Sequence, residues 1–134
     1  MKLIGVIVST AMAVLFVGAL VQAEDMIKVA PNNTKVLFEN DQVRVLETRL
    51  LPGGTLPKHS HPPRVNYFLN PTKERITYPG KPPQDFSWKA GEVAFFPAVS
   101  LEVVNIGEKE VHNIVVELKY AGDDSHHSKT MKDH

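Results

Sequence analysis

The chain has 134 residues with 15 basic and 15 acidic side chains, so its formal net charge is zero. A chain with this balance has no basic field that would attract nucleic acid. It also has no cysteine, which excludes disulfides and thiolate ligands and leaves His, Asp, Glu, Asn or water to hold any metal ion. The length suits one domain, so we expect a single domain that binds no nucleic acid.

The first 23 residues are typical of an export signal. Lys2 precedes a long apolar run, and Val21-Gln22-Ala23 fits a small-residue cleavage site. Cleavage after Ala23 would leave 14 basic and 15 acidic residues in a periplasmic or secreted protein. The alternative is an uncleaved membrane anchor, because the apolar run is close to the ~20 residues that span a bilayer. We expect contact with a membrane only in that case.

The rest of the chain is divided into short runs rich in Val, Ile, Phe, Tyr and Thr, with Gly, Pro and Asn between them. The predicted strands lie at 35–40, 42–51, 64–70, 74–79, 85–89, 92–98, 101–106 and 110–118. A large helix is not expected, because no segment sustains a 3.6-residue apolar period for three turns. Many short, regularly spaced strands indicate an all-β sandwich or barrel.

Three parts follow the predicted signal. Residues 24–40 are expected to form an N-terminal arm and the first strand, and residues 41–120 the barrel. Residues 121–134 are polar, and we predict that they form a disordered tail. This tail holds His126, His127 and His134, which we expect to chelate a metal at most loosely.

The stretch GGTLPKHSHPPRVNYFL, residues 53 to 69, places two histidines one residue apart. Residues i and i+2 of a strand point to the same face, so His59 and His61 can converge on one ion at about 2.0 to 2.1 Å from each nitrogen. The pattern predicts half of a metal site. The alternative is a pair of neutral histidines inside a barrel, each satisfied by its neighbours.

These residues resemble the cupin superfamily of small single-domain proteins over roughly Val43 to Lys119. The family's first motif runs from a glycine through His-x-His, as Gly54 and His59-Ser60-His61 do here. Its second motif runs from a glycine through an apolar strand and a proline to a third histidine, and GEVAFFPAVSLEVVNIG at 91–107 is similar to it. The resemblance implies a double-stranded β-helix, a jelly-roll barrel, with both histidines on one strand.

The metal site implied by the resemblance is degenerate. When the second motif is matched without gaps, the third histidine of the family falls on Leu101, and leucine cannot bind a metal. The family's glutamate falls on Val65 or Asn66, of which only Asn66 offers an oxygen. We therefore assign His59 and His61 as the only metal ligands.

His112 and Glu102 are the candidates to replace the missing ligand. If strands 101–106 and 110–118 pair around a turn at Glu108, His112 lies near Val104, roughly 10 Å along the strand from the lost position. We expect His112 to be a hydrogen-bonded histidine on the apolar face that carries Ile114, Val116 and Leu118. Strand alternation turns Glu102 away unless a bulge redirects it.

Two further groups of residues are expected to have ordinary roles. Arg64 and Arg75 are expected to be solvated, and the alternative is that one of them binds an anion. Six aromatic residues are expected to fill the core or line the barrel, where any that face the histidines would shape a pocket. They are Tyr67, Phe68, Phe86, Trp88, Phe95 and Phe96.

Three functions remain open at this point. The first is an exported binding domain that takes a small molecule or a weakly held divalent metal ion such as Zn, Fe, Ni, Cu or Mn. The second is a metal-dependent enzyme, a dioxygenase or isomerase like other cupins, that uses His59 and His61. The third is a structural domain that forms a homodimer. We rank the binding domain first because metal centres that do chemistry usually take three or more protein ligands. The sequence identifies no catalytic residue.

Overall fold

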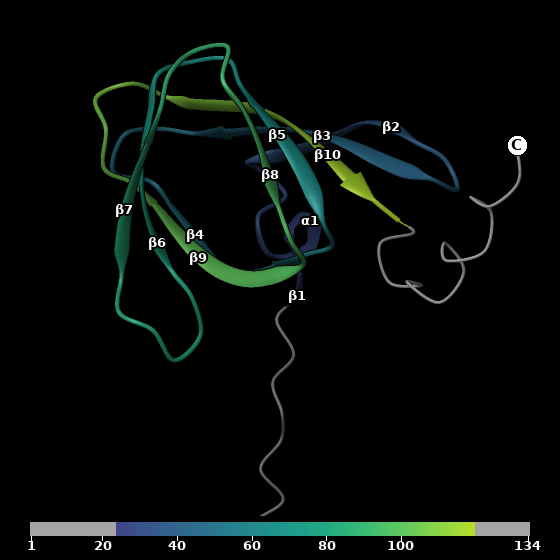
Figure 1. Ribbon diagram of the computed structural model, residues 1–134, viewed down its shortest axis with the longest axis horizontal. Coiled ribbons are helices and arrows are strands. Elements are labelled where there is room, and N and C mark those ends of the chain that lie inside the picture. Colours follow the sequence, from purple (N-terminus) through teal and green to yellow (C-terminus); the bar gives the residue numbers. More distant parts are fainter. Residues whose placement is uncertain (1–23, 120–134) are drawn as a thin grey trace, which may run out of the picture.

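The computed structural model describes residues 24–119 and is almost entirely β-structure (Figure 1). The first elements are β1 (Glu24–Asp25) and a single helical turn, α1 (Met26–Val29). The other strands are β2 (Thr34–Glu39), β3 (Val43–Leu50), β4 (Thr55–His61), β5 (Arg64–Phe68), β6 (Thr72–Thr77), β7 (Gln84–Trp88), β8 (Val93–Phe96), β9 (Val99–Asn105) and β10 (Val111–Leu118). They confirm the all-β class and each predicted strand.

The strands form two five-stranded sheets that lie face to face (Figure 1). One sheet has the order β1-β4-β9-β6-β7 and the other has the order β2-β3-β10-β5-β8. Every pairing is antiparallel except that of β1 with β4. Two such sheets around one interior form a jelly-roll barrel.

The predicted pairing of β9 with β10 is wrong. β9 lies between β4 and β6, whereas β10 lies between β3 and β5 in the other sheet. The chain crosses from one sheet to the other between Asn105 and Val111, as a double-sheet barrel requires. His112 therefore lies opposite Arg49 of β3 and not near Val104.

The interior of the barrel is half polar. Eleven buried side chains are apolar, and their largest cluster includes Leu56, Ile76 and Leu101. Eleven others are polar or charged, although such residues are mostly exposed in folded proteins. They are Thr34, Thr48, His59, His61, Arg64, Asn66, Thr72, Glu74, Asn105, Asn113 and Glu117. An interior of this kind needs partners for many polar atoms.

The outer face of the second sheet carries an apolar row, and the apolar face of β10 with Ile114, Val116 and Leu118 belongs to this outer face. The residues of β10 that point inward are Val111, Asn113, Val115 and Glu117, and the residues between them are half-buried on the outside. Across all five strands of this sheet, register aligns one apolar row that consists of Phe38, Val45, Val116, Val65 and Phe95. Both faces of β10 are thus partly apolar, so its alternation alone could not identify the inner one.

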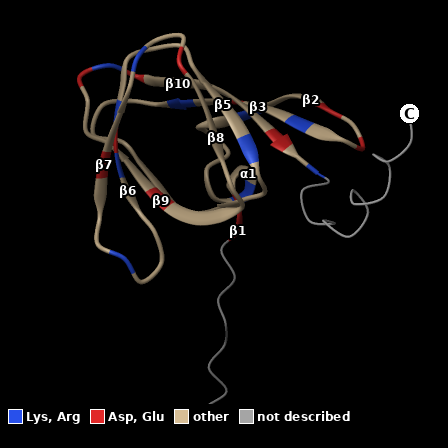
Figure 2. Ribbon diagram, viewed as in Figure 1, with Lys and Arg blue, Asp and Glu red and all other residues tan. Residues whose placement is uncertain are grey.

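Residues of both charges are interspersed along the described strands and loops (Figure 2). Within residues 24–119, no helix has the length and apolar character needed to cross a membrane. The predicted signal (1–23) and the predicted tail (121–134) lie outside the described residues.

Candidate functional site

A bulge in β4 brings the histidine pair into the barrel. β4 pairs with β9 so that Leu56 lies opposite Val103 and His59 opposite Leu101, which leaves one extra residue on β4 between the two pairs. This extra residue lets both Leu56 and His59 point inward although they are an odd number of positions apart. His59 and His61 are 1% and 7% exposed.

Hydrogen bonds fix both imidazoles in the same tautomer. His59 Nδ1 lies 2.7 Å from the carbonyl oxygen of Pro57, which only accepts, so Nδ1 carries the proton. His61 Nδ1 donates to Glu117 Oε1 at 2.6 Å. Burial lowers the pKa of both rings, and for His61 it outweighs the hydrogen bond to Glu117 and brings the pKa to about 4. Both rings are therefore neutral at pH 7, with Nε2 unprotonated and able to accept a hydrogen bond or bind a metal.

A chain of charged groups begins at the Nδ1 atom of His61. Glu117 Oε2 accepts from Arg44 Nε at 2.6 Å, and Arg44 Nη2 in turn donates to Asp25 Oδ2 at 2.5 Å. Burial opposes ionisation of Glu117, but the hydrogen bonds from His61 and Arg44 more than offset it and lower the pKa of this carboxyl. A carboxylate behind an imidazole is the arrangement that orients histidine ligands in metal sites.

The pair could supply two ligands to a metal ion, but the described residues supply no third of the usual kind. The ring centroids are 4.9 Å apart with the planes at 84°, and two imidazoles that share an ion at about 2.1 Å have centroids roughly 4.5 to 5 Å apart. Leu101 is 3% exposed and lines the same cavity, where the resemblance puts a third histidine. Among residues 24–119, no group of three or more His, Cys, Asp or Glu side chains could hold a metal ion. The fit to a metal is therefore partial, and we derive no chemical step through one.

A cavity of about 40 Å³ lies between the two sheets. Its walls carry both histidines and, from the facing sheet, Thr48, Arg64, Asn66 and Asn113. A water molecule needs about 10 to 15 Å³ of such space, so the cavity has room for about three waters or a molecule of similar size.

The prediction that Arg64 is solvated is wrong. Arg64 is 4% exposed, and its guanidinium carbon lies 4.9 Å from the centre of the Phe96 ring. The side chain alternates inward with Asn66 and Phe68 along β5, a pattern that the sequence contains but that does not say which face is inside. Arg75, by contrast, is exposed and pairs with Asp85 at 2.7 Å.

Glu74 on β6 is a cavity residue that the sequence did not single out. It is 8% exposed, and burial raises its pKa to about 7 against the opposing effect of Arg64. In β6 both faces carry a charged residue, since Glu74 alternates with Lys73 and Arg75. Only the packing of the two sheets against each other shows that Glu74 is the inward one.

The two candidates for a replacement ligand lie elsewhere. His112 Nε2 is 2.7 Å from Glu47 Oε1 on the outer side of β10, so the expectation of a hydrogen-bonded histidine is confirmed. Glu102 is exposed, as strand alternation predicts. Six residues were expected to fill the core or line the barrel. Of these, Phe68, Trp88 and Phe96 line the cavity, and Phe86 packs against the core cluster. The expectation is wrong for Tyr67 and Phe95, which are exposed on the outer face.

The arrangement of two sheets around a polar cavity with His-x-His on one wall defines a cupin-type double-stranded β-helix. Solved structures agree. A cupin domain from Bordetella pertussis Tohama I aligns with a TM-score of 0.60 and 24% identity over 64% of this chain and 91% of its own. An RmlC-like cupin family protein from Methanocaldococcus jannaschii aligns with a TM-score of 0.52 and 18% identity over 63% of this chain and 77% of its own.

The sequence alone gives no further match. No family model matches the chain, and no curated protein matches it. The chain thus has the fold of a small single-domain cupin, as the resemblance implied.

Proposed function

We propose that this protein is an exported cupin binding domain whose cavity takes a small molecule, which His59 and His61 contact directly or through a weakly held divalent metal ion. The observation that carries this proposal is the set of polar atoms without partners. Six buried side-chain nitrogen or oxygen atoms of the described residues make no hydrogen bond, and five of them belong to the cavity residues Thr48, Arg64, Asn66 and Asn113. Buried polar groups normally have partners, so a cluster of free ones around a cavity favours a bound molecule.

The test uses the single tryptophan. Trp88 lines the cavity and is the only tryptophan of the chain, so its fluorescence reports on this site, and the variants below distinguish it from the outer pocket that Trp88 also lines. The purified protein is titrated with a panel of small acids, alcohols and amides, and Trp88 emission and the melting temperature are followed. We expect at least one compound to change both. If none does, the binding proposal fails.

A double variant supplies the control for location. Asn66→Leu with Asn113→Leu removes two of the free oxygens and should weaken the response to any compound that the parent binds. Gln84→Leu, at an exposed position of β7, should leave the response unchanged. Equal weakening by both variants would mean that the compound binds outside the cavity.

Weak metal binding by His59 and His61 is the second part of the proposal. We expect less than one Zn, Fe, Ni, Cu or Mn ion per chain. The measurement is metal analysis of the full chain with His126, His127 and His134 replaced by alanine, which removes chelation by the tail. One tightly held ion per chain would contradict this and favour a metal-dependent enzyme.

Export is the third part, and the apolar run before Ala23 supports it. The intact mass of the protein recovered outside the cytoplasm should correspond to a chain that begins at Glu24. A species that retains residues 1–23 in the membrane fraction would mean that the segment is an anchor.

A metal-dependent enzyme is the second candidate, and Glu74 is the observation that favours it. A cavity carboxyl with a pKa of about 7 is in the range where a general acid or base works at neutral pH. Turnover of a ligand from the panel that Glu74→Gln abolishes would rank this candidate above the binding domain.

A structural dimer is the third candidate, and the apolar outer row favours it. Phe38 and Phe95, at its two ends, are 54% and 63% exposed. If this face joins two copies, Phe38→Lys with Phe95→Lys should convert a dimer to a monomer in sedimentation, whereas Leu51→Lys, also at an exposed position, should not.

A further inference from the structure

The cavity atoms without hydrogen-bond partners are of two kinds: some need an acceptor from a ligand, and others need a donor. Arg64 leaves Nε and Nη1 without acceptors, and a guanidinium only donates. Asn66 and Asn113 each leave Oδ1 without a donor. A molecule that satisfies Arg64 and one of the two amides must therefore accept hydrogen bonds at one end and donate one at the other.

Arg64 also brings a positive charge that no ion pair within residues 24–119 neutralises, although the carboxyl of Glu74 lines the same cavity and acts on it through charge. The two oxygens of Glu117, which lies opposite Arg64 in the β5–β10 register, are occupied by His61 and Arg44. Arg64 makes no salt bridge within residues 24–119. A buried charge is costly unless it is paired, so this wall of the cavity favours an anion.

The Phe96 ring holds the guanidinium in place. The Cα atoms of Arg64 and Phe96 are register partners in β5 and β8, and the charge lies 4.9 Å from the ring centre. Contact with an aromatic face stabilises a guanidinium and leaves the N–H groups at its edge available. Those edge donors match a carboxylate, which Arg commonly binds through two parallel hydrogen bonds.

We propose that the cavity binds a small 2-hydroxy acid, with its carboxylate on Arg64 and its hydroxyl donating to Asn66 or Asn113. This inference rests on the proposed binding function and names the ligand class of the same site. The size agrees, because an acid of two or three carbons occupies about the volume of three water molecules, which is what the cavity holds.

The experiment compares three probes on the purified protein by Trp88 fluorescence and calorimetry. Glycolate carries both the carboxylate and the hydroxyl, acetate lacks the hydroxyl, and ethylene glycol lacks the charge. We expect glycolate to bind at least tenfold more tightly than acetate, and ethylene glycol to bind most weakly. Equal affinity for glycolate and ethylene glycol, or no binding of glycolate, would overturn the proposal.

Variants locate the charge that matters. Arg64→Lys keeps the charge but removes the paired donors, and should weaken glycolate binding at least tenfold. Arg64→Met should abolish it, whereas Arg75→Met, which removes an exposed arginine, should leave it unchanged. Unchanged glycolate affinity in a folded Arg64→Lys protein would overturn the proposal. If Arg64→Met does not fold, Arg64→Lys and the probe comparison still decide.

Failure of this inference is distinguishable from failure of the proposed function. Binding of ethylene glycol or another neutral compound that alters Trp88 emission, without glycolate binding, would leave a binding domain with a different ligand class. A full panel that leaves Trp88 unaffected would remove both proposals.

Discussion

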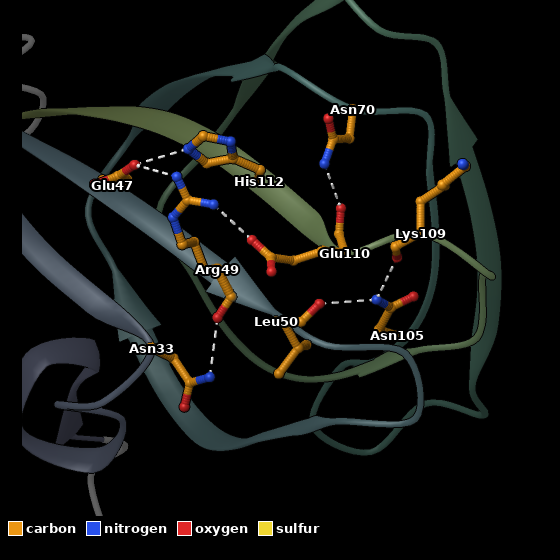
Figure 3. A network of polar contacts seen from close by, with 9 residues as sticks. All are labelled: Asn33, Glu47, Arg49, Leu50, Asn70, Asn105, Lys109, Glu110 and His112. Carbon is orange, nitrogen blue, oxygen red and sulfur yellow. Dashed lines mark hydrogen bonds and ion pairs between the residues drawn. The ribbon is translucent and has the colours of Figure 1, made fainter.

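Two groups of polar residues differ in how many hydrogen-bond partners they have. One group lies at the end of the barrel around Leu50, Asn105 and Lys109, called the loop end here. The other group lines the cavity. Asn105 is 1% exposed and donates to the carbonyls of Leu50 and Lys109 (Figure 3). It also accepts a hydrogen bond from the N–H of Gly107. Asn113 is 4% exposed, and its Oδ1 has no partner. The Asn105 amide joins separate segments of the chain, whereas Asn113 lines the cavity.

The two arginines of these regions differ in the same way. Arg49 at the loop end is 54% exposed, yet it pairs with Glu110 at 2.7 Å and Glu47 at 3.1 Å (Figure 3). Arg64 at the cavity is buried and has no carboxylate partner among the described residues. Stability alone would favour the reverse, because water can satisfy Arg49 but not a buried Arg64. The loop-end polar groups thus bond to one another, whereas several cavity polar groups have no partner among the described residues, as the proposed binding function requires.

The largest expected effect lies at the loop end. Asn105→Leu should lower the free energy of unfolding by about 3 to 4 kcal/mol, because it leaves two carbonyls and one N–H without their partner. Urea unfolding measures it. A loss well under about 1 kcal/mol would mean that water replaces these bonds and that the loop end is not a structural network.

Glu74 gives the next effect, and it depends on pH. A carboxyl whose pKa rises from 4.5 to about 7 on folding destabilises the folded state fully above pH 7 and not at all below pH 4.5. The glutamine side chain in Glu74→Gln has no carboxyl group and does not titrate. The variant should therefore be more stable than the parent by on the order of 2 to 3 kcal/mol above pH 7, and this advantage should disappear as the pH falls to 4.5.

The measurement is unfolding of both proteins across that range. The lowered pKa of His61 acts in the opposite direction, since it removes stability as the pH falls from 6.5 to about 4. It is present in both proteins and cancels in their difference. Glu102→Gln at an exposed position is the control. A pH-independent difference between Glu74→Gln and the parent would mean that Glu74 ionises normally in the folded state.

Leu101→His tests the position at which the resemblance places a third histidine ligand. Leu101 is the register partner of His59, so the new imidazole should complete a three-histidine face. Without metal the change should cost about 1 to 3 kcal/mol, because it removes a buried leucine, and Zn²⁺ or Ni²⁺ should restore part of that by binding the folded state.

Calorimetric titration of the metal measures the gain. Val103→His is the matched control, because Val103 also lines the cavity but lies opposite Leu56 and not opposite a histidine. If Leu101→His folds and gains no affinity over Val103→His, Leu101 does not face the pair, and the degenerate third ligand position is wrongly assigned.

The smallest expected effect is also the most informative for the comparison. Asn113→Leu replaces a buried amide with a free oxygen by an apolar side chain of similar size, so it should raise the free energy of unfolding by about 1 kcal/mol in the absence of ligand. Thermal and urea unfolding beside Asn105→Leu measure the contrast. Equal destabilisation by the two substitutions would remove the distinction between the two regions.

The sequence by itself determined the strands, the fold class and the histidine pair. Alternation and turn residues are local signals, which is why β2, β3 and β5 to β10 lie close to the predicted runs. β4 contains no such run, and only the His-x-His pattern indicated a strand there. The position of Leu101 on the cavity wall also followed from a local match, since the second motif lies within a single strand and its flanks.

Only the tertiary structure decided which strands meet and which faces turn inward. β9 and β10 are adjacent in sequence but belong to different sheets, and the bulge before His59 shifts the alternation of β4 by one residue. A strand has two faces, and sequence alternation distinguishes them without saying which one is enclosed. Arg64 and Glu74 lie inside because the opposite faces of β5 and β6 form the exterior of the barrel, a choice that depends on the packing of both sheets.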